Sequence, residues 1–382
     1  MKDFNFKIPQ NVEFGMGSLK KLPGILKDNE LNHVFLISDP GMERIGVVKK
    51  VKDIIEAGGI KCTEYLDVQP NPPIKIVEAA AAEYKECGAT SIVALGGGSP
   101  IDVSKAVGVL AKFGGKITDY EGIGNVPGPI VPMIAIPTTA GTGSEVTASS
   151  VITDEDNNYK FSVISYELLP KYAILDPELI MTAPASIAAA CGVDAMIHAL
   201  EAYLSTFASP FSDAMAEKAM ELIGGNLRKF VANRKDEEAA CAMMAGSTFA
   251  GISFAWARLG NVHAMSHPVS AYFHVAHGVA NSIILPTVIE FNASEDNGRY
   301  EVIYNYIREG NDLINDFKPE MLVEEIKKLN ADLGIPKKLS EVGVKEEKIK
   351  EMAVDAMKSG NVLANPRKTE LEDIIELYKI AL

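Results

Sequence analysis

Short apolar runs recur through the first half of the chain, and each run ends at a turn-forming segment. Residues 34–38, 91–95 and 132–136 are such runs, followed by Asp-Pro-Gly, by three glycines and by Pro-Thr-Thr. Continuous apolar runs of this length are typical of strands that are buried on both faces of a parallel sheet. Residues 74–87 instead carry their apolar positions at a helical period. The alternation of strands and helices predicts an open α/β sheet.

The second half of the chain has a different composition. Beyond about residue 181 it is rich in Ala, Met, Leu and Glu, and strand-like runs largely disappear. Thr182 or Ser186 is a candidate N-cap for the first helix there, with Pro184 in the first turn. We therefore expect two domains, an α/β domain over residues 1–181 and an all-α domain over residues 182–382. The length of 382 residues agrees with this division, because single cores seldom grow so large.

Composition and charge exclude several classes of partner. The formal net charge is -14, whereas binding to nucleic acid or to an anionic membrane surface requires a basic face. No run reaches the ~18 uninterrupted apolar residues of a membrane span, and the first residues lack the apolar core of a signal peptide. The four cysteines form no Cys-x-x-Cys pair. We expect a cytoplasmic protein with neither a nucleic acid nor a membrane as its partner.

Three consecutive glycines stand where a predicted strand meets a predicted helix, in the segment Gly-Gly-Gly-Ser-Pro-Ile-Asp over residues 96–102. Glycine lets the backbone approach a phosphate closely, and a helix N-terminus offers free N–H groups. Ser99 fits an N-cap and Pro100 the first helical position. A plain tight turn is the simpler interpretation, but it needs fewer glycines, so we favour a phosphate site. The segment is not the Gly-x-Gly-x-x-Gly fingerprint.

A second loop, rich in Thr and Gly, follows the next predicted strand over residues 138–145. Open α/β sheets bind ligands along the edge where such loops gather. Asp39 follows a third strand end. It is either an acceptor for ribose hydroxyls or the first residue of an Asp-Pro-Gly turn.

Carboxylate and imidazole groups gather in the helical half. Four of the six histidines lie within residues 263–277, and the pairs Asp194/His198 and His263/His267 both have i,i+4 spacing, which places each pair on one helix face. A carboxylate with neutral imidazoles suits a divalent metal such as Fe²⁺ or Zn²⁺. Spacing alone does not determine which histidines are ligands.

Longer motifs follow one another along nearly the whole chain. They are GGSPID at residues 97–102, PTTAGTGSE at 137–145, GVDAMIHALE at 192–201, GNVHAMSHP at 260–268, HGVAN at 277–281 and NPR at 365–367. With these motifs the chain resembles the iron-containing (group III) alcohol dehydrogenase family. The resemblance implies an α/β dinucleotide-binding domain followed by an all-α domain, as in the dehydroquinate synthase-like architecture.

The resemblance also assigns residues to roles. The implied metal ligands are Asp194, His198, His263 and His277, and His267 is implied to lie by the nicotinamide as a catalytic group. Asp39 is implied to favour NAD over NADP through the ribose. The cofactor contacts are completed by Asn71, Thr138, Thr139, Thr142 and Lys160, together with Gly96, Gly97, Gly98, Ser99 and Asp102 of the glycine-rich turn.

The implied activity is the interconversion of a small primary alcohol or diol with its aldehyde, using NAD and either Fe²⁺ or Zn²⁺, in a homodimer. Phe254 resembles a residue of the substrate pocket. Trp256 and Arg258 depart from the family pattern; they are either a core aromatic and a surface cation, or Arg258 holds an anionic aldehyde. Cys191 and Ser270 also depart from it without removing a ligand. A lyase of the dehydroquinate synthase type is a further alternative, but its ligands are a Glu and two His.

Overall fold

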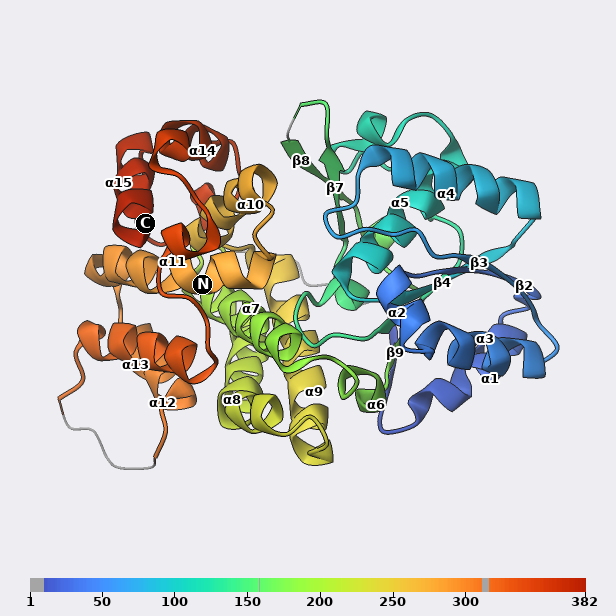
Figure 1. The fold of residues 1–382 in the computed structure, drawn as a ribbon, viewed down its shortest axis with the longest axis horizontal. Helices are drawn as coiled ribbons and strands as arrows, with labels where there is room; N and C mark the ends of the chain where they lie inside the picture. The colour runs from blue at the N-terminus through green and yellow to red at the C-terminus, as the bar shows by residue number, and fades with distance from the viewer. Residues whose placement is uncertain (1–9, 158, 311–315) are drawn as a thin grey trace. The chain divides into compact units, whose positions relative to one another are not determined.

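The computed structural model describes residues 10–157, 159–310 and 316–382. By their contacts these residues form two compact units, one made of residues 10–139 and 143–183 and the other of residues 140–142, 184–310 and 316–382. The boundary that the sequence predicts, residue 181, stands beside residue 183. We describe each unit by itself (Figure 1).

A six-stranded sheet forms the centre of the first unit, in the order β1-β9-β6-β4-β2-β3. All its strand pairs are parallel. Its strands are β1 (Asn11–Phe14), β2 (His33–Ile37), β3 (Lys61–Tyr65), β4 (Ser91–Gly96), β6 (Met133–Pro137) and β9 (Tyr172–Leu175). The three predicted apolar runs are β2, β4 and β6, which lie side by side. The prediction of a parallel α/β sheet is confirmed.

Both faces of this sheet are covered, which explains why its strands β2, β4 and β6 are apolar at almost every position. Val34 and Leu36 of β2 join one core cluster, while Phe35 and Ile37 of the same strand join another. The first cluster includes residues of α1 (Leu22–Asp28) and α3 (Val47–Ala57). The second includes residues of α4 (Ile74–Cys87) and α5 (Gly98–Phe113). Helix α4 begins and ends where the helical period predicts.

Smaller elements complete this unit. They are α2 (Pro40–Arg44), α6 (Pro177–Ile180), the strands β5 (Gly122–Ile123), β7 (Ser149–Asp154) and β8 (Tyr159–Ile164), and 3-10 turns at Ser18–Lys21, Ile117–Tyr120, Ser144–Val146 and Tyr166–Leu168. Strands β5, β8 and β7 form a separate sheet, in which β7 and β8 are antiparallel.

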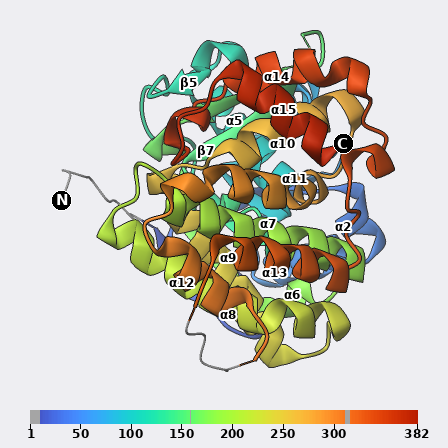
Figure 2. The same ribbon diagram turned by 90° about the vertical axis from the view of Figure 1, so that its left-hand side faces the viewer.

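The second unit is helical, as predicted (Figure 2). Its helices are α7 (Ala185–Leu204), α8 (Pro210–Ala232), α9 (Glu237–Ala257), α10 (Asn261–Phe273), α11 (His277–Asn292), α12 (Arg299–Ile307), α13 (Pro319–Asp332), α14 (Ile349–Met357) and α15 (Leu371–Ala381). Its 3-10 turns are Ala293–Glu295, Leu339–Val342, Glu346–Lys348 and Val362–Ala364. Helix α7 packs against α8, α9 and α11, and α11 packs against α10, α13 and α15.

Two predicted helix starts are wrong. Helix α5 has Gly97, not Ser99, as its N-cap, because Gly96 at φ 145° and the extended Gly97 reverse the chain directly after β4. Helix α7 has Pro184 as its N-cap and no side-chain cap. The hydroxyl of Thr182 donates to the carbonyl of Leu179 instead.

By length and composition, two helices of the described residues could cross a membrane. They are α7 and α9, with 78% and 61% of their most apolar windows buried inside the fold. This is the burial of core helices, and in α7 it reflects packing on three neighbours.

The adjacent residues Gly224 and Gly225 of α8 provide a matched test of helix packing. A Cβ at Gly224 would lie 2.0 Å from the carbonyl oxygen of Tyr306, whereas a Cβ at Gly225 would meet nothing within 4 Å. We expect Gly224→Ala to lower the free energy of unfolding by about 2–3 kcal/mol, because α12 must move away. Gly225→Ala should raise it by about 0.5–1 kcal/mol, because alanine favours the helix. Urea denaturation measures both, and equal effects would contradict this packing.

Candidate metal centre and cofactor loops

Three helices bring a carboxylate and two imidazoles together in the helical unit. Asp194 lies in the middle of α7, His263 near the start of α10, and His277 is the first residue of α11. One ligand atom from each lies within 4.8 Å of the other two. Asp194 Oδ1 is 3.6 Å from His263 Nε2 and 3.9 Å from His277 Nε2.

His198 stands one turn after Asp194 on α7. Its Nε2 lies 3.9 Å from Asp194 Oδ1, and its ring stacks on that of His263 with the centroids 4.6 Å apart. Its Nδ1 lies 3.2 Å from the carbonyl oxygen of Gly141, to which a protonated Nδ1 donates. That contact leaves Nε2 as the nitrogen with a lone pair, facing Asp194. Gly141 must be glycine, because a Cβ there would lie 2.8 Å from the Cβ of Cys191.

The amide of Asn281 tests whether these residues fit a cation. Its Nδ2 lies 2.6 Å from Asp194 Oδ1 and 3.1 Å from the Nε2 atoms of both His263 and His277. An amide nitrogen carries two hydrogens, so it cannot serve three acceptors at once. More lone pairs therefore point at this position than the two amide hydrogens can satisfy. One carboxylate with imidazoles is a set of ligands that suits divalent iron or zinc. The residues fit a divalent cation.

The other unit places several of its predicted cofactor residues at one edge of the sheet. Strands β2, β4 and β6 are neighbours and parallel, so Asp39, Gly96 and Thr138 all lie at their carboxyl ends. The chain passes from β2 to β3 on one side and then to β4 on the other. Ligands of open α/β sheets bind at such a reversal of strand order.

The contacts at this edge agree with that placement. Asp39 Oδ1 accepts from the N–H groups of Gly41 and Met42 and caps α2, while a Cβ on Gly96 would lie 3.2 Å from Asp39 Oδ2. Asp39 therefore forms the predicted turn with one oxygen, whereas its second oxygen lies near Gly96 and its role toward a ribose stays a prediction. A Cβ on Gly97 would lie 3.3 Å from Thr139 Oγ1.

Comparison with known proteins identifies the family. Residues 9–177 match the family described as iron-containing alcohol dehydrogenase, and residues 188–382 match the C-terminal part of the Fe-containing alcohol dehydrogenase family. The chain belongs to the iron-containing alcohol dehydrogenase family. The resemblance seen in its motifs is confirmed, and an alcohol dehydrogenase rather than a lyase is supported.

Named relatives of this alcohol dehydrogenase act on small alcohols and aldehydes. The NAD-dependent methanol dehydrogenase of Bacillus methanolicus is 36% identical over 379 residues, which cover 99% of this chain and 100% of the relative. The lactaldehyde reductase of Escherichia coli K12 is 38% identical over 374 residues, covering 96% and 97%. The crystal structure of a 1,3-propanediol oxidoreductase superposes with a TM-score of 0.96 at 34% identity, and each chain is covered completely.

Burial and mutual charge set the protonation of the candidate metal centre in this alcohol dehydrogenase. Burial raises the pKa of Asp194, but His198, His277 and His263 together hold it well below its usual range. Burial lowers the pKa of His198 to about 4, although Asp194 raises it. Burial also lowers the pKa of His263, but the carboxylates Glu201 and Asp194 outweigh it and raise the pKa to about 9. Asp194 is therefore a carboxylate and His198 a neutral imidazole at neutral pH, the forms that bind metals.

Glu201, like Asn281, is a residue of this centre that sequence reasoning did not single out. It lies on α7, only 5% exposed, and its Oε2 is 2.5 Å from His263 Nδ1. Asp194, His198 and Glu201 follow one another at i, i+4 and i+7, which places all three on one helix face. Extending the carboxylate–histidine pair by one turn was the signal that could have found it.

The remaining predicted residues of the helical unit divide into two groups. Phe254 and His267 lie with the metal centre, since Phe254 packs on His198 at 4.5 Å and His267 stacks on His277 at 5.3 Å between centroids. Arg258 follows the last residue of α9 at φ 65°, and its exposed guanidinium lies 4.4 Å from the ring centroid of Phe207. Arg258 is thus the C-cap of α9, which ends at Ala257.

Two further predicted cofactor residues of the sheet unit contact each other. Lys160 Nζ donates to Asn71 Oδ1 at 2.7 Å, and Asn71 adopts φ 53°. Burial lowers the pKa of Lys160 to about 8. By its contacts, Thr142 belongs to the helical unit.

Asp102 has partners within the protein. It accepts from the hydroxyl of Ser144 at 2.5 Å and from the N–H of Val151 at 3.1 Å. The buried Lys105 donates to the carbonyls of Ser144 and Ser149, both at 2.7 Å. Asp102 thus holds Ser144, in the loop that follows β6, and the start of β7.

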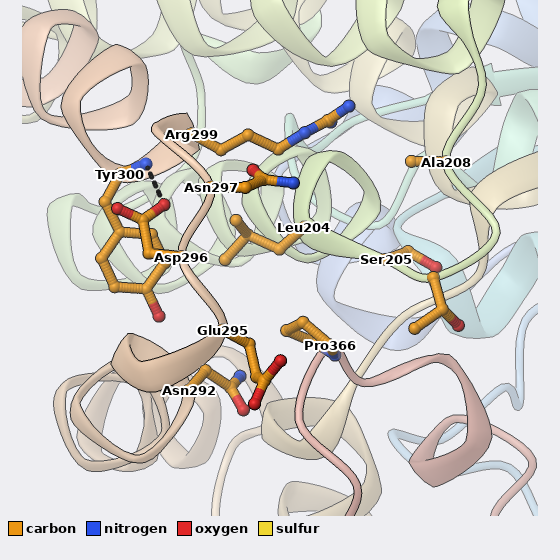
Figure 3. A pocket seen from close by; sticks show the side chains of 11 residues that line it. Leu204, Ser205, Ala208, Asn292, Glu295, Asp296, Asn297, Arg299, Tyr300 and Pro366 are labelled. Carbon is orange, nitrogen blue, oxygen red and sulfur yellow. Dashed lines mark hydrogen bonds between the residues drawn. The ribbon is translucent and has the colours of Figure 1, made fainter. Parts of the chain in front are cut away.

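A separate pocket of about 260 Å³ lies between α7, α12 and the chain around Pro366 (Figure 3). Asp296 accepts from the N–H of Tyr300 at its rim, and Arg299 is paired with Asp213 at 2.8 Å. The residues that line this pocket include none of the predicted site residues.

The metal centre is tested by a matched pair of histidine variants. His263→Asn should lose stoichiometric metal and reduce turnover by at least about 100-fold, because a missing ligand costs at least what the loss of its supporting partner costs. His274→Asn is the control, since His274 is exposed, ends α10 at φ 55° and stands outside the cluster. Elemental analysis of the purified proteins measures the metal. Full metal content in His263→Asn would refute the assignment.

Proposed function

We propose that this alcohol dehydrogenase interconverts a small primary alcohol or diol with its aldehyde, using NAD and a divalent metal, Fe²⁺ before Zn²⁺. The observation that carries the proposal is the convergence of Asp194, His263 and His277 in a buried cluster. The relatives support the substrate class, because their names specify methanol, lactaldehyde and 1,3-propanediol.

Asp194, His198, His263 and His277 would hold the cation, which supplies Lewis acidity toward the oxygen of an alcohol or aldehyde. Asp194 contributes the negative charge of the site, and its burial keeps that charge unscreened by water. The ring of Phe254 against His198 gives the site an apolar wall. We assign His267 as the catalytic histidine, since its ring stacks on that of His277 beside the metal centre and an imidazole is a common general acid and base.

The cofactor proposal rests on the sheet unit. The first turn of α5 has no side-chain cap among the described residues, so its N–H groups can receive a pyrophosphate. Asp39 Oδ2, which faces Gly96, would accept from the ribose hydroxyls. Gly96, Gly97, Gly98, Ser99, Thr138 and Thr139 are proposed to complete this edge, with Asn71, Lys160 and Thr142 as further contacts.

An alcohol panel tests the proposed function. Protein reconstituted with Fe²⁺ or with Zn²⁺ should produce NADH from methanol, propanol, 1,2-propanediol or 1,3-propanediol at steady state, and a chelator should abolish that activity. The proposal would be contradicted if metal-loaded protein formed no NADH from any alcohol of the panel.

Cofactor choice is tested by Asp39→Asn, which keeps an oxygen for the α2 cap and removes the charge. We expect the wild-type protein to prefer NADH over NADPH, because a carboxylate repels a 2′-phosphate. The ratio of kcat/KM for the two cofactors should fall by about tenfold in the variant, the equivalent of 1.4 kcal/mol. Equal kcat/KM values in the wild-type protein would count against the role of Asp39.

The variant Arg258→Ala tests whether Arg258 binds an anionic aldehyde or is a surface residue that leaves the substrate neutral. Its stacking on Phe207 favours a surface role, so Arg258→Ala should leave kcat/KM for propanal and for a three-carbon aldehyde acid equally unaffected. The control is Arg308→Ala, which removes another arginine lying over an aromatic ring. An increase of about tenfold or more in KM for the acid alone, as expected for a lost Arg–carboxylate pair, would favour the anionic aldehyde instead.

A further inference from the structure

We propose that Glu201 is a positioning residue that keeps the Nδ1 proton of His263 in place, so that Nε2 of the same ring is free to bind a cation. The inference rests on the proposed metal centre and adds a residue that acts on that centre through His263.

The two nitrogens of the His263 ring face different surroundings. Nε2 lies 3.6 Å from Asp194 Oδ1, on the side of the metal cluster, whereas Nδ1 lies 2.5 Å from Glu201 Oε2. A carboxylate can only accept a hydrogen bond, so Nδ1 must be the donor. A cation can bind only the neutral ring, which has lost the second proton that the raised pKa of His263 otherwise retains. That neutral imidazole carries one N–H. With that proton held at Nδ1, the lone pair remains at Nε2 and points at the cluster.

The carboxylate of Glu201 cannot exchange its two oxygens freely, because both are engaged. Oε1 accepts from the N–H of Val262 at 2.7 Å. A Cβ on Gly260 would lie 2.9 Å from Glu201 Oε1 and 3.1 Å from Asn365 Oδ1, so the backbone approaches both groups closely. Asn365 Oδ1 accepts from the N–H of Asn261, the first residue of α10.

The start of α10 is therefore held by two side chains from distant parts of the sequence. A carboxylate is favourable there, because the helix N-terminus carries partial positive charge. This arrangement also gives Asn365, from the motif Asn365-Pro366-Arg367, a place in the structure. The amide of Asn365 donates to and accepts from the amide of Asn292, the last residue of α11. Asn365 therefore links the start of α10 to the end of α11.

A purely structural role for Glu201 would be to cap α10, and the variant Glu201→Gln separates the two roles. Glutamine keeps the length and shape of the side chain, and its amide oxygen can still accept from Val262. Its NH₂ group then faces His263 Nδ1 as a donor. Nδ1 has to become the acceptor, the ring proton moves to Nε2, and Nε2 has no lone pair for a cation.

The affinity for Co²⁺, followed by its visible absorption in competition with a chelator, measures this effect. We expect E201Q to bind Co²⁺ about 10–100-fold more weakly than the wild-type protein, as is typical when the partner of a metal-bound histidine is lost. The matched control is Glu290→Gln, the same change at an exposed position of α11, which should bind Co²⁺ like the wild-type protein.

A second variant, Glu201→Asp, makes the test independent of stability. Aspartate still only accepts, but its shorter side chain weakens the contact with Val262. We therefore expect opposite orders: E201D is less stable to urea than E201Q, while E201Q binds Co²⁺ more weakly than E201D. If metal affinity simply followed stability in both variants, Glu201 would be a helix cap and the inference would be overturned.

The outcomes also separate this inference from the proposed function. Wild-type protein that binds no stoichiometric Co²⁺, or His263→Asn that still binds it, would refute the metal centre itself. If wild-type protein binds Co²⁺, His263→Asn does not, and E201Q binds within about twofold of wild type, only the role of Glu201 fails, because the expected loss is at least about tenfold.

Discussion

The burial of Asp194 is the constraint on which the helical unit depends. Its side chain lies in the middle of α7, 3% exposed, in a helix whose other neighbours are mostly apolar. An uncompensated buried carboxylate costs several kcal/mol, so partners must reach it from elsewhere in the fold. His198 comes from the same helix, and His263 and His277 come from α10 and α11. The packing of α7, α10 and α11 therefore provides both the partners that stabilise the buried carboxylate and the arrangement of the proposed ligand atoms.

Close contacts between helices allow these residues to come together. A Cβ on Gly192 of α7 would lie 2.3 Å from Leu227 Cδ1, and one on Gly278 of α11 would lie 2.2 Å from the carbonyl oxygen of Ala190. Glycine at both positions lets α8 and α11 approach α7 more closely than any other residue would allow. Because His277 precedes Gly278, the same contact that packs α11 on α7 also sets the distance of His277 from Asp194.

In the sheet unit, the proposed site depends on strand topology rather than on helix packing. Parallel strands end at one edge, and the strand order reverses there between β2 and β4, which is where open α/β sheets bind their ligands. The groups offered at that edge are the backbone of Gly96 and Gly97 and the second oxygen of Asp39. In the helical unit the proposed ligand atoms belong to side chains held by packing, whereas here most belong to the backbone and follow from topology.

The local sequence pattern by itself determined β2, β4, β6 and α4, because the spacing of apolar residues along a segment reflects which faces of its strand or helix are buried. It also pointed to a carboxylate and several histidines, since the spacings of Asp194 to His198 and of His263 to His267 are local, while the motifs carried the family and, through the resemblance, the choice of ligands. Only the tertiary structure decided that α5 starts at Gly98, that α9 ends before Arg258 and that Glu201 meets His263. These depend on how distant segments pack, and a local pattern records that a residue is buried but not which residue it is buried against.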